Sequence, residues 1–221
     1  MVEVSGTRSD SVSTNHAIEF ISTTGSTTGP KGGGDISANF IAASVLNAGS
    51  AANTGIDIST APLGGSHCLF GWVYANSTAG APMIAGKWNA SNSSTLGYIL
   101  DIESGIAYGY NGGSAYYYAG AAISASAWHF LCMWRDFADG LVRFSIDNGT
   151  VYASATSSTP TNVASPLTFG ADYTQALKLN GRLSRFGWIK GSFLTSSERT
   201  TMYNGGPTGA LSWADIVAGG L

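Results

Sequence analysis

The sequence predicts an all-β protein built as a two-sheet antiparallel sandwich, and two observations carry this prediction. From residue 35 onward, short runs of alternating or β-branched and aromatic residues recur between clusters of Gly, Ser, Asn and Asp, a spacing typical of a sandwich or jelly roll. The second observation is the segment 128–149, in which two strand patterns flank one turn. We interpret this segment as a hairpin in the middle of the sandwich.

The first strand of this hairpin is predicted to bury both of its faces, because apolar side chains occupy both sets of alternating positions. One face carries Trp128, Phe130, Cys132 and Trp134, and the other carries Leu131 and Met133. The turn 136–140 ends in a glycine suited to positive φ. The second strand alternates Val142, Phe144 and Ile146 with polar residues, and Asn148-Gly149 then predicts a two-residue hairpin turn.

The composition of the chain limits the classes of function that it can have. The chain has 221 residues, of which 44% are hydrophobic and only 10% are charged, against about 25% charged in an average soluble protein. A net charge of −3 without any Lys/Arg cluster argues against nucleic-acid binding, and no apolar run approaches the roughly 20 residues that cross a bilayer. The polar surface must therefore consist of Ser, Thr, Asn, Gly and Tyr, which suits contact with neighbouring proteins or sugars, although an ordinary soluble β protein could share it.

Three regions are expected along the chain. Residues 1–35 are predicted to form a flexible N-terminal arm, because one apolar run at 17–21 is followed by Ser, Thr and Gly at almost every position of 22–34. The run at 17–21 would anchor the arm as a strand, and the arm either docks on a neighbouring subunit or frays. Residues 36–206 form the sandwich, and 207–221 form a C-terminal tail.

Strands and one helix are expected within the sandwich. The predicted strands are 40–46, 54–58, 68–74, 82–88, 98–102, 106–110, a strand opening at 116–118, 151–155, 167–169 and 183–189. The helix is expected to begin after Thr195, whose side chain can cap it while the side chain of Glu198, three residues later, bonds back to Thr195. It is expected to end near Tyr203, before Asn204-Gly205-Gly206-Pro207.

Eight short segments in order carry a resemblance to a known family. They are 70–74, 84–87, 97–101, 128–130, 142–149, 166–170, 181–186 and 194–206. Together they resemble the laminin G-like domains of the concanavalin A-like lectin/glucanase superfamily. The resemblance implies a two-sheet antiparallel jelly roll over residues 36–206. It also implies binding of glycans or proteins, and some glucanases of the superfamily are enzymes.

A glycosidase site is not expected. The glucanase branch carries Glu-x-Asp-x-Glu on one strand, and here the corresponding residues are Ile99, Asp101 and Glu103, so the nucleophile position holds isoleucine. We interpret the segment as a strand with two outward-facing acids. His16, His67 and His129 are scattered without a nucleophile motif, and His129 is expected to be a strand residue with a satisfied hydrogen bond. The protein is therefore predicted not to be an enzyme.

No cofactor is expected, although the resemblance allows calcium. The closest pair of acids is Asp136 and Asp139 in one turn, where they act either as calcium ligands or as caps of the turn. The two cysteines, Cys68 and Cys132, lie in strand patterns and are expected to be buried free thiols, with a cross-strand disulfide as the alternative.

Aromatic residues are the candidate binding site. Five tyrosines flank one predicted hairpin: Tyr108, Tyr110, Tyr116, Tyr117 and Tyr118. Alternation places Tyr108 with Tyr110, and Tyr116 with Tyr118, on one face each. An exposed row of tyrosines could stack on sugar rings or anchor a protein partner, and cross-strand packing within the sheet is the alternative. Trp88, followed by polar residues, is a second candidate contact.

These observations predict a non-catalytic binding or structural jelly roll. Because the chain starts with Met, shows no signal peptide and has low charge, the first hypothesis is a virus or bacteriophage surface protein. It would be a capsid decoration protein or fibre component that contacts neighbouring subunits as a homo-oligomer or in a capsid shell, with glycan contacts on the host. The second hypothesis is an extracellular carbohydrate-binding or adhesion module, and the third is a glycoside hydrolase.

Overall fold

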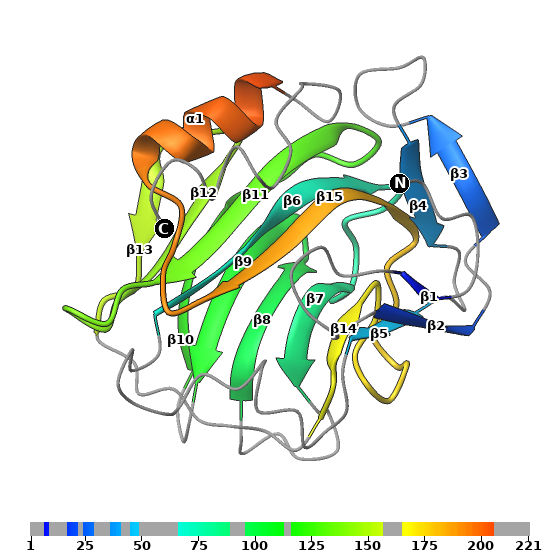
Figure 1. Cartoon of the computed structure of the whole chain (residues 1–221), viewed down its shortest axis with the longest axis horizontal. Coiled ribbons are helices and arrows are strands. Elements are labelled where there is room, and N and C mark those ends of the chain that lie inside the picture. The colour runs from blue at the N-terminus through cyan, green and yellow to red at the C-terminus, as the bar shows by residue number, and fades with distance from the viewer. Residues whose placement is uncertain are drawn as a thin grey trace.

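Two antiparallel sheets face each other in the computed structural model (Figure 1). The structure describes residues 7–8, 17–21, 24–28, 36–40, 45–48, 66–88, 96–112, 116–156 and 165–205, with side chains from residue 66 onward except at 96, 116, 117, 190 and 205. The chain is a two-sheet jelly-roll sandwich with one short helix, as the alternating patterns predict.

Sheet A has eight strands in the spatial order β1-β2-β5-β14-β7-β8-β9-β10. Their bounds are β1 Thr7–Arg8, β2 Ala17–Ile21, β5 Val45–Ala48, β14 Leu167–Phe169, β7 Met83–Trp88, β8 Leu96–Glu103, β9 Ile106–Gly112 and β10 Tyr116–Ala122. The strands β7 to β10 form a continuous antiparallel meander, and this half of the sheet positions the candidate site.

Sheet B has seven strands in the order β13-β12-β11-β6-β15-β4-β3. Their bounds are β13 Val151–Ala153, β12 Val142–Ile146, β11 Trp128–Arg135, β6 His67–Ala75, β15 Gly181–Lys190, β4 Ile36–Phe40 and β3 Thr24–Thr28. The predicted central hairpin is confirmed, because β11 and β12 pair antiparallel in the middle of the chain. Gly140, which closes their turn, has φ +71°.

The core lies between the two sheets. Sheet A contributes buried side chains such as Ile84 and Leu100, and sheet B contributes Leu131, Met133 and Phe144. Fully burying a side chain of this size stabilises the fold by about 1.5–3 kcal/mol. The predicted division of the β11 side chains is confirmed, because Leu131 and Met133 lie in this core while the alternate residues face outward.

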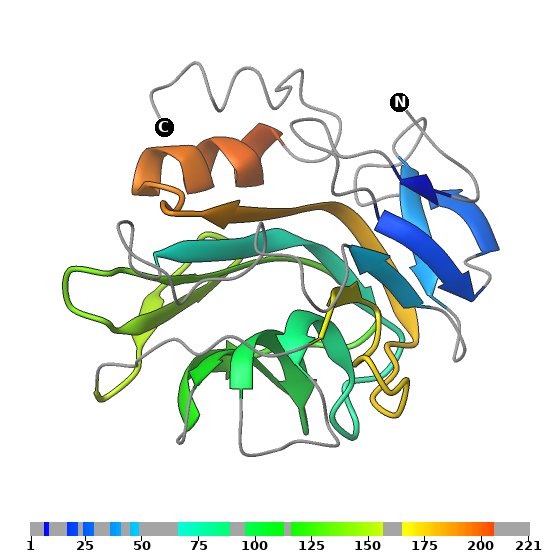
Figure 2. The ribbon, with the colours of Figure 1, turned by 60° about the horizontal axis from the view of Figure 1, so that its bottom comes forward.

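Helix α1 (Ser196–Gly205) covers the outer face of sheet B (Figure 2). Its Tyr203 ring stacks on Trp72, with ring centroids 5.7 Å apart and planes inclined by 14°. The predicted capping box is present: the Glu198 N–H donates to Thr195 Oγ1 at 3.2 Å, and the Thr195 N–H donates to Glu198 Oε2 at 2.6 Å. The ten residues of α1 cannot span a membrane, and the described part of the chain has no helix that could.

Several local predictions differ from the structure. The segment 24–28, predicted as part of a flexible link, forms strand β3 against β4, because an edge strand of Thr and Ser needs only backbone pairing. The predicted strand 40–46 divides into β4 and β5, which belong to different sheets. The β12–β13 turn has positive φ at Asp147 (+51°) and Asn148 (+53°), one residue earlier than the Asn-Gly signal suggests.

Other predictions concern the ends of the chain. The anchor predicted at 17–21 coincides with β2, which pairs with β5. The predicted strand 54–58 and the tail 207–221 lie outside the described residues. The division into arm, jelly roll and tail stays a prediction.

Candidate functional site

The outer face of sheet A presents a group of aromatic and acidic side chains, which we call the tyrosine face. Leu100 and Ile102 of β8 point into the core, so Ile99, Asp101 and Glu103 point outward. The same alternation on the next two strands directs three tyrosines outward, because their neighbours Ala107, Ala119 and Ala121 are core residues. The tyrosine face therefore consists of Met83, Ile99, Asp101, Glu103, Tyr108, Tyr110 and Tyr118.

The three tyrosine rings form one cluster across strands β9 and β10. Tyr118 lies directly opposite Tyr110 in the register of the two strands. The ring centroids are 5.5 Å apart for Tyr108–Tyr110, 5.5 Å for Tyr108–Tyr118 and 5.6 Å for Tyr110–Tyr118. Tyr110 is buried at the base with 8% of its surface exposed, Tyr108 is half-buried, and Tyr118 is 53% exposed. The cluster is thus a packed platform whose outermost ring is open to solvent.

Two carboxyl groups lie beside this platform on β8. Asp101 is opposite Tyr108 in the register and has only 7% of its surface exposed, and among the described residues its Oδ1 has no hydrogen-bond partner. Burial, and secondarily the charge of Glu103, raises the pKa of Asp101 well above its ordinary value. Both acids occupy the outward-facing positions of β8 as predicted, and the structure shows that Glu103 is exposed whereas Asp101 is buried.

The Tyr110 hydroxyl belongs to the same polar group. Its pKa is raised above the ordinary value, first by burial and then by the nearby charges of Asp101 and Glu103. The hydroxyl therefore keeps its proton and donates a hydrogen bond to Glu103. The tyrosine face consequently combines flat apolar rings with hydrogen-bonding oxygen atoms, the two features that a sugar requires.

Trp88 extends the aromatic surface at the end of β7. It is half-buried and packs against the cluster of Met83, Ile99 and Tyr110, while its indole N–H has no partner among the described residues. The structure therefore brings Trp88 together with Tyr108, Tyr110 and Tyr118. Tyr116 and Tyr117 lie on β10 opposite Gly112 and Asn111, and only their backbone is described. The role of these six residues in ligand contact stays a prediction.

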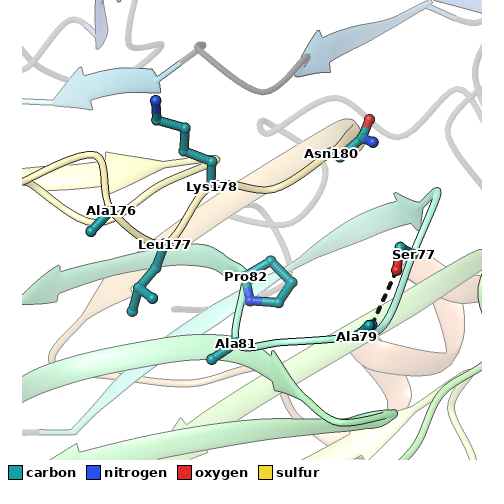
Figure 3. Close-up of a pocket in the computed structure, with 8 residues that line it drawn as sticks. All are labelled: Ser77, Ala79, Ala81, Pro82, Ala176, Leu177, Lys178 and Asn180. Carbon is teal, nitrogen blue, oxygen red and sulfur yellow. Dashed lines mark hydrogen bonds between the residues drawn. The ribbon is translucent and has the colours of Figure 1, made fainter.

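A small cavity of about 170 Å³ lies between two loops at the rim of the sandwich (Figure 3). Two loops line it, one with Ser77, Ala79, Ala81 and Pro82 and the other with Ala176, Leu177, Lys178 and Asn180. Leu177 also packs against the cluster of Met83, Ile99 and Tyr110, so the cavity adjoins that surface.

Hydrogen bonds hold these two rim loops in place. The buried carboxylate of Asp172 accepts hydrogen bonds from the N–H groups of Thr174 (3.1 Å) and Leu177 (2.8 Å) and from the Thr174 hydroxyl. The Asn76 side chain donates to Asn180 Oδ1 at 2.8 Å across the loops. These hydrogen bonds therefore fix the loops that give the cavity its shape.

The acids of the β11–β12 turn have partners within the turn. Asp136 Oδ1 accepts from the Ala138 N–H and Asp139 Oδ1 from the Leu141 N–H, each at 2.9 Å, which is the capping role. Both Asp139 oxygens also accept from the Arg143 guanidinium, and these bonds lower the pKa of Asp139 to about 2. Within the described ranges no three His, Cys, Asp or Glu side chains group to hold a metal. A calcium site at Asp136 and Asp139 stays an untested prediction.

Three polar side chains form a hydrogen-bonded series that was not predicted from the sequence. Ser124 Oγ lies 2.8 Å from His129 Nε2, and His129 Nδ1 lies 2.7 Å from Asp147 Oδ2. The second Asp147 oxygen accepts from the Phe130 N–H at 2.8 Å. The predicted satisfied hydrogen bond of His129 is confirmed. These hydrogen bonds connect the loop between β10 and β11 to the β11–β12 pair. The order of the three residues, serine, histidine and aspartate, is also that of the catalytic triad of serine hydrolases.

The two cysteines lie beneath helix α1 on the outer face of sheet B. Both are buried free thiols, and their Sγ atoms are 3.6 Å apart. Burial raises the pKa of Cys132 well above its ordinary value, and the hydrogen bond with Cys68 adds to this.

Comparison with known proteins identifies the fold class. No family model and no curated protein sequence matches the chain. Solved structures do match, and the fold that they share with this chain is the two-sheet jelly-roll sandwich. This is the fold that the resemblance to laminin G-like domains implies.

Three of these structures illustrate the likeness. Domain 4 of AbnA, a GH43 extracellular arabinanase from Geobacillus stearothermophilus solved with arabinotriose, superimposes with a TM-score of 0.58 at 14% identity, over 90% of this chain and 85% of that one. The binding domain of Paraclostridial Mosquitocidal Protein 1 gives 0.63 at 12% identity, over 91% and 51%. The receptor binding domain of botulinum neurotoxin mosaic serotype C/D gives 0.59 at 14% identity, over 91% and 50%. The chain thus spans about half the length of the two toxin domains, and identities this low establish the fold alone.

Proposed function

We propose that this protein is a non-catalytic carbohydrate-binding domain whose tyrosine face is the contact surface. The observation that carries the proposal is the exposed ring of Tyr118 on a packed platform of Tyr108 and Tyr110, with the carboxyl groups of Asp101 and Glu103 beside it. An aromatic ring packs against the C–H face of a pyranose or furanose, while oxygen acceptors bind its hydroxyl groups.

The solved neighbours support a binding role. One neighbour is an arabinanase domain in complex with arabinotriose, and two others are binding domains, one of a botulinum neurotoxin and one of a mosquitocidal protein. Their sites are not transferred to this chain, because the identities are 12–14%. The support is an analogy between domains of one fold class, because a fold by itself does not determine function.

The proposal is tested by glycan binding with a matched pair of tyrosine variants. Isothermal titration against arabinotriose, cellotriose and lactose is expected to show saturable binding that Tyr118→Ala weakens about fivefold or more, since truncating an aromatic contact of this kind costs upward of about 1 kcal/mol. The control is Tyr152→Ala, because Tyr152 is similarly exposed (42%) but lies on β13 of sheet B. Equal losses in both variants, or no binding to any sugar, would contradict the proposal.

The non-catalytic part of the proposal has its own test. Ile99 stands where the resemblance to glucanases would require the nucleophile, so β8 supplies only two of the three acids of that motif. We expect no product after long incubation with arabinan, β-glucan or the oligosaccharides above. Turnover that disappears in Glu103→Gln would identify a glycosidase instead.

The virus or bacteriophage surface role is a second candidate, and it rests on composition. A chain with only 10% charged residues has a surface suited to close contact with neighbouring subunits, and a glycan site would serve such a protein in host attachment. Native mass spectrometry is the test: a defined homo-oligomer favours this role, and a monomer that binds glycans favours an extracellular module.

A further inference from the structure

We propose that the rim cavity between the loops 77–82 and 176–180 is a subsite for the acetamido group of an amino sugar, so that the domain prefers N-acetylated glycans. This inference rests on the proposed function and names the ligand class that the adjoining surface would take. It assigns a ligand to a hollow that the hydrogen bonds of the fold keep open.

The first argument is that hydrogen bonds join the two loops at both ends of the cavity. The Asn76 N–H donates to the Asn180 carbonyl oxygen at 2.9 Å, and the Met83 N–H donates to the Leu177 carbonyl oxygen at 3.1 Å. Residues 77–82 connect these two bonds on one side, and only residues 178–179 connect them on the other. The longer segment therefore bows away from the shorter one and leaves a hollow between them.

The bowed segment is itself fixed. The Ala79 N–H donates to Ser77 Oγ at 3.2 Å, and the Gly80 carbonyl oxygen accepts from the Ser104 N–H of the β8–β9 turn at 3.0 Å. A cavity that is already formed in the free protein spends little binding free energy on ordering its walls. The rim cavity thus meets this general condition for a binding site.

The second argument is the size and the apolar lining of the cavity. Its volume of about 170 Å³ is below the roughly 300 Å³ at which pockets for whole drug-sized ligands begin, so it accepts one substituent rather than an oligosaccharide. Three alanines, Pro82 and Leu177 supply the apolar part of the lining. These small apolar groups suit a methyl group, whereas a hydroxyl group placed against them would lose hydrogen bonds to water.

The polar part of the lining complements an amide. Asn180 Oδ1 accepts from the Asn76 side chain at 2.8 Å, which leaves the Asn180 amide nitrogen to donate to an acetyl carbonyl oxygen. Ser77 Oγ accepts from the Ala79 N–H and retains a second lone pair for the acetamido N–H. Methyl, carbonyl and N–H groups of one acetamido substituent therefore each find a matching part of the cavity.

The third argument is charge. Of the described residues that line the cavity, only Lys178 is charged, and its side chain extends away from Pro82 (Figure 3). A carboxylate or phosphate at the centre of the cavity would lose its hydration without gaining an opposite charge. An acetamido group is neutral and bears no such cost.

The fourth argument is the position of the cavity relative to the tyrosine face. Leu177 lines the cavity and also packs against the cluster that contains Met83 and Tyr110. Met83 and Tyr108 lie on the two sides of Asp101 in the register, so two strand spacings of ~4.8 Å, about 10 Å in all, separate the start of β7 from the tyrosine platform. A glycan stacked on the tyrosine rings therefore reaches the cavity with a neighbouring sugar unit.

The experiment compares two trisaccharides that differ only in the group the cavity would hold. Chitotriose and cellotriose share the same backbone and linkage, and each chitotriose unit carries an acetamido group where cellotriose carries a hydroxyl group. Isothermal titration of the full chain should show that chitotriose binds about tenfold or more tightly. Equal affinities would overturn the preference for N-acetylated glycans.

A cavity-filling variant locates the preference. Ala79→Leu should bring the affinity for chitotriose to within about twofold of that for cellotriose, because the larger side chain occupies the cavity while the tyrosine rings are untouched. The matched control is Ala138→Leu. Ala138 is also an exposed alanine whose N–H donates to a side chain two residues earlier, but it lies in the β11–β12 turn of sheet B. The control should keep the full preference.

A second variant changes one atom of the lining. Asn180→Asp keeps the oxygen that accepts from Asn76 and replaces the donor nitrogen by an oxygen, so the loops stay joined. We expect the preference for chitotriose to fall about fivefold or more, since the acetyl carbonyl loses its donor. Thermal unfolding should show nearly the same melting temperature as wild type. This variant also decides the question if Ala79→Leu does not fold.

The outcomes separate the two proposals. A preference for chitotriose that survives both Ala79→Leu and Asn180→Asp would overturn the cavity subsite, while binding that still depends on Tyr118 leaves the proposed function standing. Chitotriose binding that depends on Ala79 but not on Tyr118 would retain the subsite and refute the tyrosine face. Absence of binding to both trisaccharides, arabinotriose and lactose would refute the proposed function and the subsite with it.

Discussion

Gly120 of β10 leaves the space that the Tyr108 ring occupies on the tyrosine face. A Cβ atom built on Gly120 would lie 2.3 Å from Cδ1 of Tyr108 and 2.5 Å from the carbonyl oxygen of Ala107. The tyrosine ring therefore lies across the neighbouring strand at a position where any other residue would displace it. The shape of the candidate site depends on a residue that contributes no side chain.

Gly120→Ala is expected to lower the free energy of unfolding by about 1–3 kcal/mol, because the added methyl group collides with a ring and a backbone carbonyl. Urea unfolding followed by tyrosine and tryptophan fluorescence measures the change. Ala122→Ser is the control, since Ala122 is an exposed residue on the same face of the same strand, and its effect should stay within about 0.5 kcal/mol. A Gly120→Ala protein as stable as wild type would show that Tyr108 does not need this space.

The stability of Asp101→Asn should depend on pH. Burial raises the folded-state pKa of Asp101 above that of the unfolded chain, so its contribution to stability is fully present below the ordinary aspartate pKa and is lost as pH rises through the folded value. The asparagine variant avoids this loss. We expect it to be more stable than wild type at pH 7, by about 1–3 kcal/mol, and the gain should vanish near pH 3.

Thermal unfolding of both proteins from pH 3 to pH 8 checks this prediction. Asp139→Asn serves as the opposite case, because hydrogen bonds from Arg143 and Leu141 lower the Asp139 pKa to about 2. Its wild-type carboxylate contributes stability above the ordinary aspartate pKa that is lost as pH falls toward 2. A pH profile of the same sign for both variants would contradict the assignment for Asp101.

Asp147→Ala should be the most disruptive change at the Ser124–His129–Asp147 chain. It removes the acceptors of both the His129 ring and the Phe130 N–H, and unfolding studies should show a loss of about 1–3 kcal/mol. Ser124→Ala, which removes one exposed hydroxyl, should cost less than about 1 kcal/mol.

The same three side chains offer a test of the proposal that the protein is non-catalytic. A serine nucleophile needs, besides the histidine, preorganised donors for the developing oxyanion. We expect a fluorophosphonate probe to leave Ser124 unlabelled, as judged by intact mass. Labelling that Ser124→Ala and Asp147→Ala both abolish would reveal a hydrolytic activity and would contradict the proposed function.

The thiols of Cys68 and Cys132 should react only when the protein unfolds. Both are buried beneath α1, and burial raises the pKa of Cys132, so little reactive thiolate is present at pH 8. Ellman's reagent should find two slow thiols in the native protein and two fast ones in guanidinium chloride. Fast reaction of the native protein would mean that α1 opens readily from sheet B.

Alternation made much of the fold predictable from the sequence. Side chains repeat with a period of two along a strand, so the opposite faces of Leu131 and Cys132 on β11, and the shared face of Tyr108 and Tyr110, follow from the order of residues alone. The capping box of Thr195 and Glu198 was also predictable, because the two residues that form it are only three positions apart in the sequence.

Features that depend on three or more strands were not predictable. The sequence indicates that Asp101 faces outward, but no residue spacing signals that it lies opposite Met83 and Tyr108 or that only 7% of its surface is exposed. Ser124, His129 and Asp147 come from a loop, a strand and a turn, and no residue spacing signals their meeting. Asn148-Gly149 marked the right turn, but the positive φ angles fell on Asp147 and Asn148.

The two outer faces of the sandwich are treated unequally, since α1 roofs one sheet and the other presents its tyrosines. If the tyrosine face is the glycan site, as proposed, a long polymer approaches from that side alone and the domain binds it in a fixed orientation. A fluorophore or fusion partner attached on the helix side would project away from the polymer, which makes that side the natural place for a reporter.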